Sequence, residues 1–308
     1  MTHRTLHDHS CHHGWNRDLP PALEVAPGTT VSFNVADASG GQLGADATLA
    51  DLRNLDFSLV NPLSGPVFVE GAEPGDALVV DLLQFIPSGS GWTANIPGFG
   101  LLADEFTEPY LKVWTYDRHM AEFAPGIRVP VQPFPGTLGN APAEPGPHSV
   151  VPPRRVGGNM DIRDLCAGTR LYLPVEVPGA LFSIGDTHAA QGDGEVCGTA
   201  IESAMDVTLR LSLVKGANFA FPRFRTPGPV TRHIDQQGYD VTTGVASDLL
   251  SASRDAVRGM IDHLGREYGL APDDAYLLCS VCADLRVSEV VDLPNYLVSL
   301  YFPRAVFS

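Results

Sequence analysis

The sequence TRLYLPVEVPGALFSIGDTHAAQGDGE, residues 169–195, joins the strand pattern of this chain to its densest group of polar side chains. Its first part, residues 169–184, consists of two apolar runs on either side of a Pro-Gly pair, which is typical of a strand, a turn and a second strand. If the second strand continues to His188, the alternation of side chains places Asp186 and His188 on the same face. The stretch therefore predicts a strand that ends in a polar site.

The residues that follow His188 leave two interpretations open. The glycines of this stretch allow backbone conformations that residues with a Cβ resist, so Gln191, Asp193 and Glu195 can fold back toward the same face and complete a pocket. The alternative is a polar hairpin loop in which the Asp side chains only cap turns. Other parts of the chain are needed to choose between a pocket and a loop.

The strand and Pro-Gly pattern recurs elsewhere in the chain. Residues 23–35 and 65–83 repeat it, as a hairpin or a bend, and residues 205–214 alternate apolar and polar side chains as a strand does. The nearly continuous apolar run 77–83 indicates a strand buried on both sides, as inside a sandwich. With 31 glycines, 26 prolines and only 18% charged residues, the composition favours a mainly β protein.

A proline-rich segment, residues 124–155, predicts irregular structure over much of its length and a division of the chain. We place an N-terminal β-rich half at residues 1–150. The C-terminal half, residues 151–308, carries the polar motif, further strands and two late helices.

Those two helices are predicted near the C-terminus. Apolar residues recur at helical spacing through 247–268, and Pro272 opens a second helix with acidic residues in its first turn. Two strands, residues 285–291 and 297–302, follow the helices. These elements predict a small C-terminal α/β unit.

Charge and cysteine usage exclude several classes of partner. The formal net charge is −16 without a Lys/Arg cluster, so the protein would repel phosphate backbones, and no nucleic-acid partner is expected. No apolar run approaches the ~20 residues of a membrane span, and the polar start is unlike a signal peptide.

The cysteines are odd in number and scattered along the chain, which indicates reduced thiols: Cys11, Cys166, Cys197, Cys279 and Cys282. We expect a soluble cytoplasmic protein with no membrane partner. The CxxC pair has no second pair to form a zinc ribbon, and its helical spacing favours core packing.

A succession of motifs makes the chain resemble the acetamidase/formamidase family nearly end to end. In order, the motifs are DASGGQ at 37–42, NPLSGPV at 61–67, EGAEPGD at 70–76, IPGFG at 96–100, GGNMD at 157–161, YGL at 268–270 and SEVVD at 288–292. The resemblance implies a mostly β fold: a jelly-roll-like β-sandwich, a smaller β unit and a C-terminal α/β subdomain with two helices. It also implies hydrolysis of short amides to a carboxylic acid and ammonia, a bound divalent metal, often zinc, and a homo-oligomer of two or more subunits.

The same resemblance points to metal ligands at Asp161, Asp186 and His188. Glu195 and Glu202 follow as acid/base candidates. A divalent metal with an open position lowers the pKa of its bound water from ~15.7 toward ~7, and a nearby carboxylate can move the proton to the departing nitrogen. One imidazole and two carboxylates suit zinc without excluding manganese, iron or calcium.

Substrate contacts are expected from residues around these ligands. The Gln191 loop, through the backbone N–H groups of residues 191–194, or Asn159 can stabilise an oxyanion, and Asp37 can line the pocket. Each assignment has an alternative in which the residue has only a structural role: Asp161 as a turn cap, His188 as a core imidazole, or Asp37 in a simple glycine turn. Glu202, seven residues beyond Glu195, can also face elsewhere.

Together these features predict a metal-dependent hydrolase of small amides, of the formamide or acetamide type. Lactams are an alternative substrate for the same site. A thiol hydrolase that uses Cys166 or Cys197 with a histidine is a second enzyme hypothesis, although no motif supports it. A third hypothesis is a non-catalytic jelly-roll protein that holds a metal or a small ligand.

Overall fold

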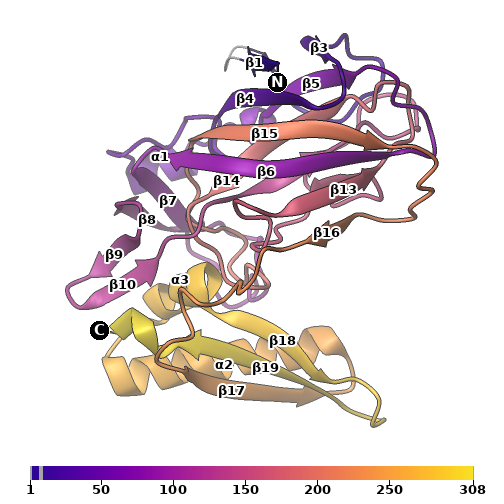
Figure 1. Ribbon diagram of the computed structural model, residues 1–308. Helices are drawn as coiled ribbons and strands as arrows, with labels where there is room; N and C mark the ends of the chain where they lie inside the picture. The colour runs from indigo at the N-terminus through magenta and orange to yellow at the C-terminus, as the bar shows by residue number, and fades with distance from the viewer. Residues whose placement is uncertain (1, 7–9, 308) are drawn as a thin grey trace.

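Two sheets dominate the computed structural model, which describes residues 2–6 and 10–307 (Figure 1). Sheet A has the order β1 (His3–Leu6), β4 (Thr29–Val35), β15 (Met205–Val214), β6 (Ala77–Pro87), β13 (Arg170–Pro174) and β16 (Arg223–Arg225). Sheet B has the order β12 (Gly157–Asn159), β11 (Phe134–Gly139), β14 (Phe182–His188), β5 (Leu63–Val69) and β2 (Cys11–His12), with β3 (Leu23–Val25) paired to β5. The mainly β class predicted from composition is confirmed.

The recurring Pro-Gly units connect one sheet to the other. β3 and β5 belong to sheet B and lead into β4 and β6 of sheet A, while β13 of sheet A leads into β14 of sheet B. None of these pairs forms a hairpin, because the two strands of each unit bond to different neighbours. Gly28, Gly75 and Gly179 have positive φ angles at these bends, a conformation that residues with a Cβ rarely adopt.

One large hydrophobic core holds the two sheets together. Phe33 on β4 and Phe182 on β14 meet edge to face, with ring centroids 6.2 Å apart. Every residue of β14 is buried, and burying a large apolar side chain contributes roughly 1.5–3 kcal/mol. The strand that carries the polar motif is therefore held inside the core. The jelly-roll connectivity stays a prediction.

Strands from both expected halves of the chain share these sheets. In Figure 1 the orange β15 lies between β4 and the purple β6, and in sheet B β14 lies between β11 and β5. The expectation that much of residues 124–155 is irregular is right for 140–155, which contain no named strand, but the segment also contains β10 (Ile127–Pro130) and β11. Pro135 is tolerated within β11 because β12 pairs only with Thr137–Gly139, so the strand has a free edge at the proline.

The predicted C-terminal unit is confirmed. It consists of α2 (Leu249–Tyr268), α3 (Pro272–Cys282) and an antiparallel sheet of order β17 (Tyr239–Ala246), β19 (Tyr296–Pro303) and β18 (Asp284–Glu289). The unit lies below the two large sheets in Figure 1. Cys279 and Cys282 on α3 are buried thiols, as the helical spacing predicts.

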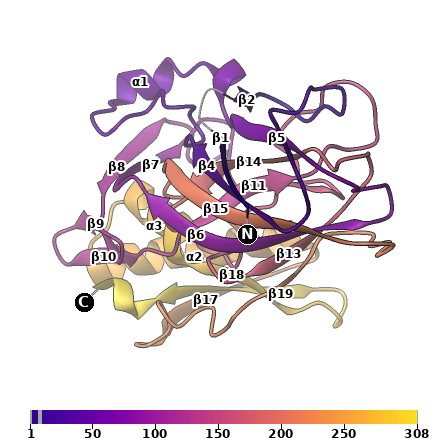
Figure 2. The same cartoon turned by 45° about the horizontal axis from the view of Figure 1, so that its top comes forward.

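Smaller elements complete the fold at its edges. Two hairpins pair β7 (Ser90–Asn95) with β8 (Tyr110–Thr115) and β9 (Met120–Ala124) with β10. The helix α1 (Leu49–Arg53) and the 3₁₀ turn η1 (Phe57–Leu59) follow β4, and η2 (Arg304–Phe307) follows β19. Figure 2 shows α1 far from the C-terminal unit.

The bend between β13 and β14 provides a test of the fold. Gly179→Ala would place a Cβ 2.0 Å from the Phe68 ring at a φ of +76°. The Ala variant is expected to lose about 3 kcal/mol of the free energy of unfolding, from the strained backbone and from overpacking together. Urea unfolding measures this loss.

Gly71→Ala is the matched control. Its φ is +74°, but nothing lies within 4 Å of the added Cβ. The control is expected to lose only about 1 kcal/mol, the cost of a left-handed residue. Equal losses in the two variants would show that the close approach to Phe68 does not matter.

Candidate metal and active site

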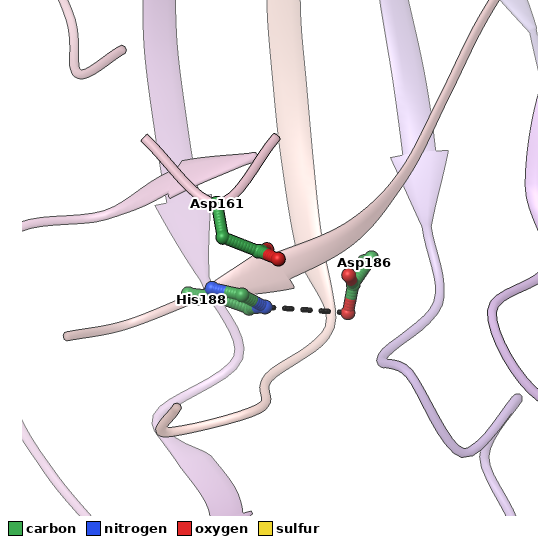
Figure 3. Close-up of side chains that lie close together, drawn as sticks. All are labelled: Asp161, Asp186 and His188. Atoms are coloured by element: carbon green, nitrogen blue, oxygen red, sulfur yellow. Dashed lines mark hydrogen bonds and ion pairs between the residues drawn. The ribbon is translucent and has the colours of Figure 1, made fainter. Parts of the chain in front are cut away.

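Three side chains predicted as metal ligands converge at the end of β14 (Figure 3). His188 Nε2 lies 3.2 Å from Asp186 Oδ1. Asp161, which follows β12, offers a carboxylate oxygen within 4.8 Å of the ligand atoms of the other two residues. Asp186 and His188 of this motif therefore belong to a cluster with Asp161, a residue outside the loop.

The two predicted acid/base residues lie in the same cluster. Glu202 Oε2 is 3.2 Å from His188 Nε2, and its Oε1 accepts a hydrogen bond of 2.7 Å from the Ala200 N–H. Glu195 offers an oxygen within 4.8 Å of ligand atoms on His188 and Glu202. The alternative in which Glu202 faces elsewhere is wrong, because its Oε2 lies beside His188 Nε2.

Strained backbone conformations position three of these acids. Asp161, Asp186 and Glu195 have φ angles of 50°, 54° and 43°. Left-handed residues that are not glycine are uncommon and gather at functional sites, where the surrounding structure enforces them. The side-chain directions of this cluster are therefore imposed by the fold.

Burial sets the ionisation of the cluster. Burial raises the pKa of Asp161 to about 7 and that of Glu202 to about 7, while the pKa of Glu195 rises well above its ordinary value for the same reason. Burial opposes charge on His188 and Asp186 too, but their mutual attraction, together with Glu202, raises the pKa of His188 and lowers that of Asp186. The cluster resists carrying all of its negative charges at once.

Two oxygens in this cluster lack hydrogen-bond partners. Asp161 Oδ1 and Glu202 Oε2 are buried and accept no hydrogen bond, although Glu202 Oε2 lies 3.2 Å from His188 Nε2, and a missing hydrogen bond is costly for carboxyl oxygens. Both belong to side chains that surround His188 Nε2. A divalent cation among these donors would satisfy both oxygens, so the residues fit a metal site.

Gln191 connects the imidazole to the Asp161 segment. Its Oε1 accepts a hydrogen bond of 2.8 Å from His188 Nδ1, and its Nε2 donates one of 2.8 Å to the Asp161 carbonyl. A proton on Nδ1 leaves the Nε2 lone pair for a cation. Both ends of the Gln191 amide are thus engaged by the protein.

The other predicted contact residues differ in their distance from the site. Asn159 lines the cavity above the cluster, where its Oδ1 accepts a hydrogen bond of 2.6 Å from Thr137. Asp37 does not line the cavity. It accepts a hydrogen bond of 3.0 Å from Nε1 of Trp92, which does line it. The expected inward turn of Asp193 is wrong, because its carboxylate lies 3.5 Å from the Arg163 guanidinium.

The loop between His188 and Cys197 is anchored to the C-terminal unit. The Gly192 N–H donates to the Ser280 carbonyl at 2.8 Å, and the Cys197 N–H donates to Ser280 Oγ at 3.1 Å. The Leu285 N–H donates to the Asp193 carbonyl at 2.9 Å. The Gly192 amide is therefore unavailable as the expected oxyanion donor.

Two residues important to this geometry were missed in the sequence. A Cβ on Gly136 would lie 2.6 Å from Asp161 Oδ1 and 2.9 Å from His188 Nε2, so only glycine leaves room for the cluster. A glycine within a strand is a known sign of such close approach. Ser280, between the two CxxC thiols, gave no signal of its role because its contacts are far away in the chain.

Buried carboxyls that line a cavity beside a buried imidazole are an arrangement typical of an active or binding site. The model of the acetamidase/formamidase family matches residues 2–150 and 146–308. The chain belongs to the acetamidase/formamidase family. The expected enzyme class, a hydrolase acting on C–N bonds of linear amides, is confirmed at the level of this family.

Relatives and solved structures agree with this assignment. The formamidase of Methylophilus methylotrophus is 31% identical over 372 residues, covering 97% of this chain and 90% of the relative. The acetamidase of Mycolicibacterium smegmatis is 28% identical over 344 residues, covering 87% and 84%. A γ-lactamase from Delftia acidovorans superposes with a TM-score of 0.89 at 31% identity, over 97% of this chain and 90% of that chain. An acetamidase from Bacillus halodurans gives a TM-score of 0.69 at 31% identity, over 98% of each chain. Among the described residues, no helix has both the length and the apolar character needed to cross a membrane.

In protein prepared without metal, the ionisation of this cluster is expected to change the stability with pH. The pKa values of Asp161 and Glu202 are raised in the folded state, so the stability they contribute is present below their ordinary pKa values and is lost as the pH rises through about 7. The raised pKa of His188 acts in the same direction, and the lowered pKa of Asp186 affects only more acidic solutions. The melting temperature of metal-free protein is expected to fall between about pH 5 and pH 8.

Glu202→Gln removes one titrating group and is expected to reduce that fall. Glu24→Gln, a change at an exposed position on β3, serves as the control and keeps the wild-type profile. A melting temperature that stays level or rises over this range would contradict the electrostatic account.

Proposed function

We propose that this protein is a metal-dependent amidase that converts small amides of the formamide or acetamide type into a carboxylic acid and ammonia. Membership of the acetamidase/formamidase family supports the amide chemistry. The observation that supports the metal dependence is that two buried oxygens, Asp161 Oδ1 and Glu202 Oε2, accept no hydrogen bond in the cluster around His188.

Asp161, Asp186 and His188 are the proposed ligands of the metal, which we take to be zinc. One imidazole and two carboxylates are a donor set that zinc accepts. When bound, the cation supplies Lewis acidity, which polarises the amide carbonyl and makes water a better nucleophile. The hydrogen bond from His188 Nδ1 to Gln191 keeps the imidazole oriented with Nε2 toward the cluster.

Glu195 and Glu202 are proposed to move the proton. Both line the cavity beside the ligands. The proton must leave the attacking water and reach the departing nitrogen, and a positioned carboxyl contributes roughly 10²–10⁴-fold to such a transfer. Glu202 is held by the Ala200 N–H through one oxygen, which leaves the other oxygen for this role.

Substrate positioning is proposed to involve Asn159, Gln191 and Asp37. Asn159 lines the cavity and is placed to hydrogen-bond the amide. Gln191 acts through His188, and Asp37 acts through Trp92, because their polar atoms are bonded to those side chains. We also propose a homo-oligomer, a dimer or larger, in the cytoplasm; the five free cysteines fit a reducing compartment.

Among the alternatives, lactam hydrolysis at the same site has one observation in its favour. The structure is similar to a γ-lactamase, with a TM-score of 0.89. The thiol hydrolase has none, because burial raises the pKa values of Cys166 and Cys197 and neither thiol lines the cavity.

Chelation tests the metal dependence. Protein stripped of metal is expected to lose nearly all release of ammonia from acetamide, and added zinc is expected to restore it. Asp186→Ala and His188→Ala are expected to lose bound metal in elemental analysis, whereas Asp193→Ala, which removes a carboxylate outside the cluster, keeps it. Release of ammonia at full rate after chelation would overturn the proposal.

The two glutamates can be separated by amide variants. Glu195→Gln and Glu202→Gln leave the three proposed ligands in place, so a residue that transfers the proton is expected to lower kcat by roughly 10²–10⁴-fold while metal content is retained. Steady-state kinetics with acetamide and elemental analysis provide the two measurements. Unchanged kcat in both variants would rule out both carboxyls as the proton carrier.

A further inference from the structure

The cavity above the metal cluster is much larger than a small amide. Its volume is about 390 Å³, within the range of roughly 300–1,000 Å³ that holds drug-sized ligands. Acetamide, with only a handful of non-hydrogen atoms, would fill a small part of this space. The unfilled part must accommodate either solvent or a larger acyl group.

The chemistry of the cavity is divided between its floor and its walls. The floor carries the carboxyls of the metal cluster and Asn159, which suit the amide end of a substrate. The walls are apolar and come from several segments of the chain: Phe57, Trp92, Ile96, Phe99 and Val151. An amide bound at the floor therefore directs its acyl group against apolar side chains.

Three wall residues are unusually exposed for their type. The exposed fractions are 63% for Phe57, 47% for Phe99 and 48% for Val151. Exposed apolar side chains gathered at one opening are typical of a binding site rather than of core packing. Each Å² of apolar surface that a ligand covers there is worth roughly 25 cal/mol.

Two further features of the cavity indicate the shape and the charge of its ligand. Trp92 is held in place by its hydrogen bond to Asp37, so one wall presents a fixed aromatic face. The described residues that line the cavity include no Lys or Arg, while they include four carboxyls. An acyl group that carries a negative charge would be left uncompensated there.

We propose that the preferred substrates of this enzyme are neutral primary carboxamides with a bulky, apolar, ring-containing acyl group. This inference rests on the proposed amidase function and specifies its substrate class. The C–N bond of the ring carboxamide breaks, water supplies the hydroxyl of the acid and one proton of ammonia, whose other two protons come from the carboxamide, and no other reactant is required. Phe57, Phe99 and Trp92 are the residues that determine the specificity.

The test compares kcat/KM for formamide, acetamide, cyclohexanecarboxamide, benzamide and 4-carbamoylbenzoate on zinc-loaded protein. The two neutral ring amides are expected to exceed acetamide by at least about tenfold, the discrimination that added apolar contact provides. The charged ring amide, 4-carbamoylbenzoate, is expected to fall at least about tenfold below benzamide.

Phe57→Ala is expected to reduce the ratio of kcat/KM between cyclohexanecarboxamide and acetamide by about fivefold or more. Phe221→Ala is the matched control, because Phe221 is also 63% exposed but does not line this cavity. The control is expected to keep the wild-type ratio.

The possible results test the proposed substrate class separately from the proposed amidase function. If acetamide is hydrolysed as well as or better than the ring amides, the inference is overturned and the amidase function stands. If the charged ring amide equals benzamide, the requirement for a neutral acyl group is overturned. If no amide of the series releases ammonia, both the inference and the proposed function are overturned.

Discussion

Several carboxyls buried around one imidazole are the constraint on which this structure depends. Carboxylates resist transfer out of water, yet Asp186, Glu202 and His188 are almost completely buried. The fold holds them together through left-handed backbone at Asp186 and through the fully buried strand β14. The packing of the core, including Phe182 on Phe33, thus holds together carboxyls whose negative charges would repel one another.

Local pattern in the sequence was sufficient for much of the fold and part of the site. The alternation through β14 placed Asp186 beside His188, and helical spacing placed α2 and α3. Long-range features were less accessible, because they depend on partners far away in the chain. The inward direction of Glu202 depends on backbone bridges to Trp92 and His188, and the outward direction of Asp193 depends on Arg163.

Proline content was misleading for only part of residues 124–155, and for a physical reason. Residues 124–155 looked irregular because proline cannot donate a hydrogen bond, but β11 has an open edge where Pro135 needs no donor. For the Pro-Gly pairs, the local prediction from the sequence was right. Their turns were recognised, but only the structure shows that they lead from sheet B to sheet A or back.

The anchoring of residues 192–197 to Ser280 and Leu285 joins the site to the C-terminal unit. Partial opening of that unit would release the loop that carries Glu195, so local unfolding and loss of the site are one event. Thermodynamic linkage then requires that whatever binds the closed site also suppresses the opening. Slower amide hydrogen exchange in α3 and β18 on ligation, at a distance from the bound molecule, would be the signature of that linkage.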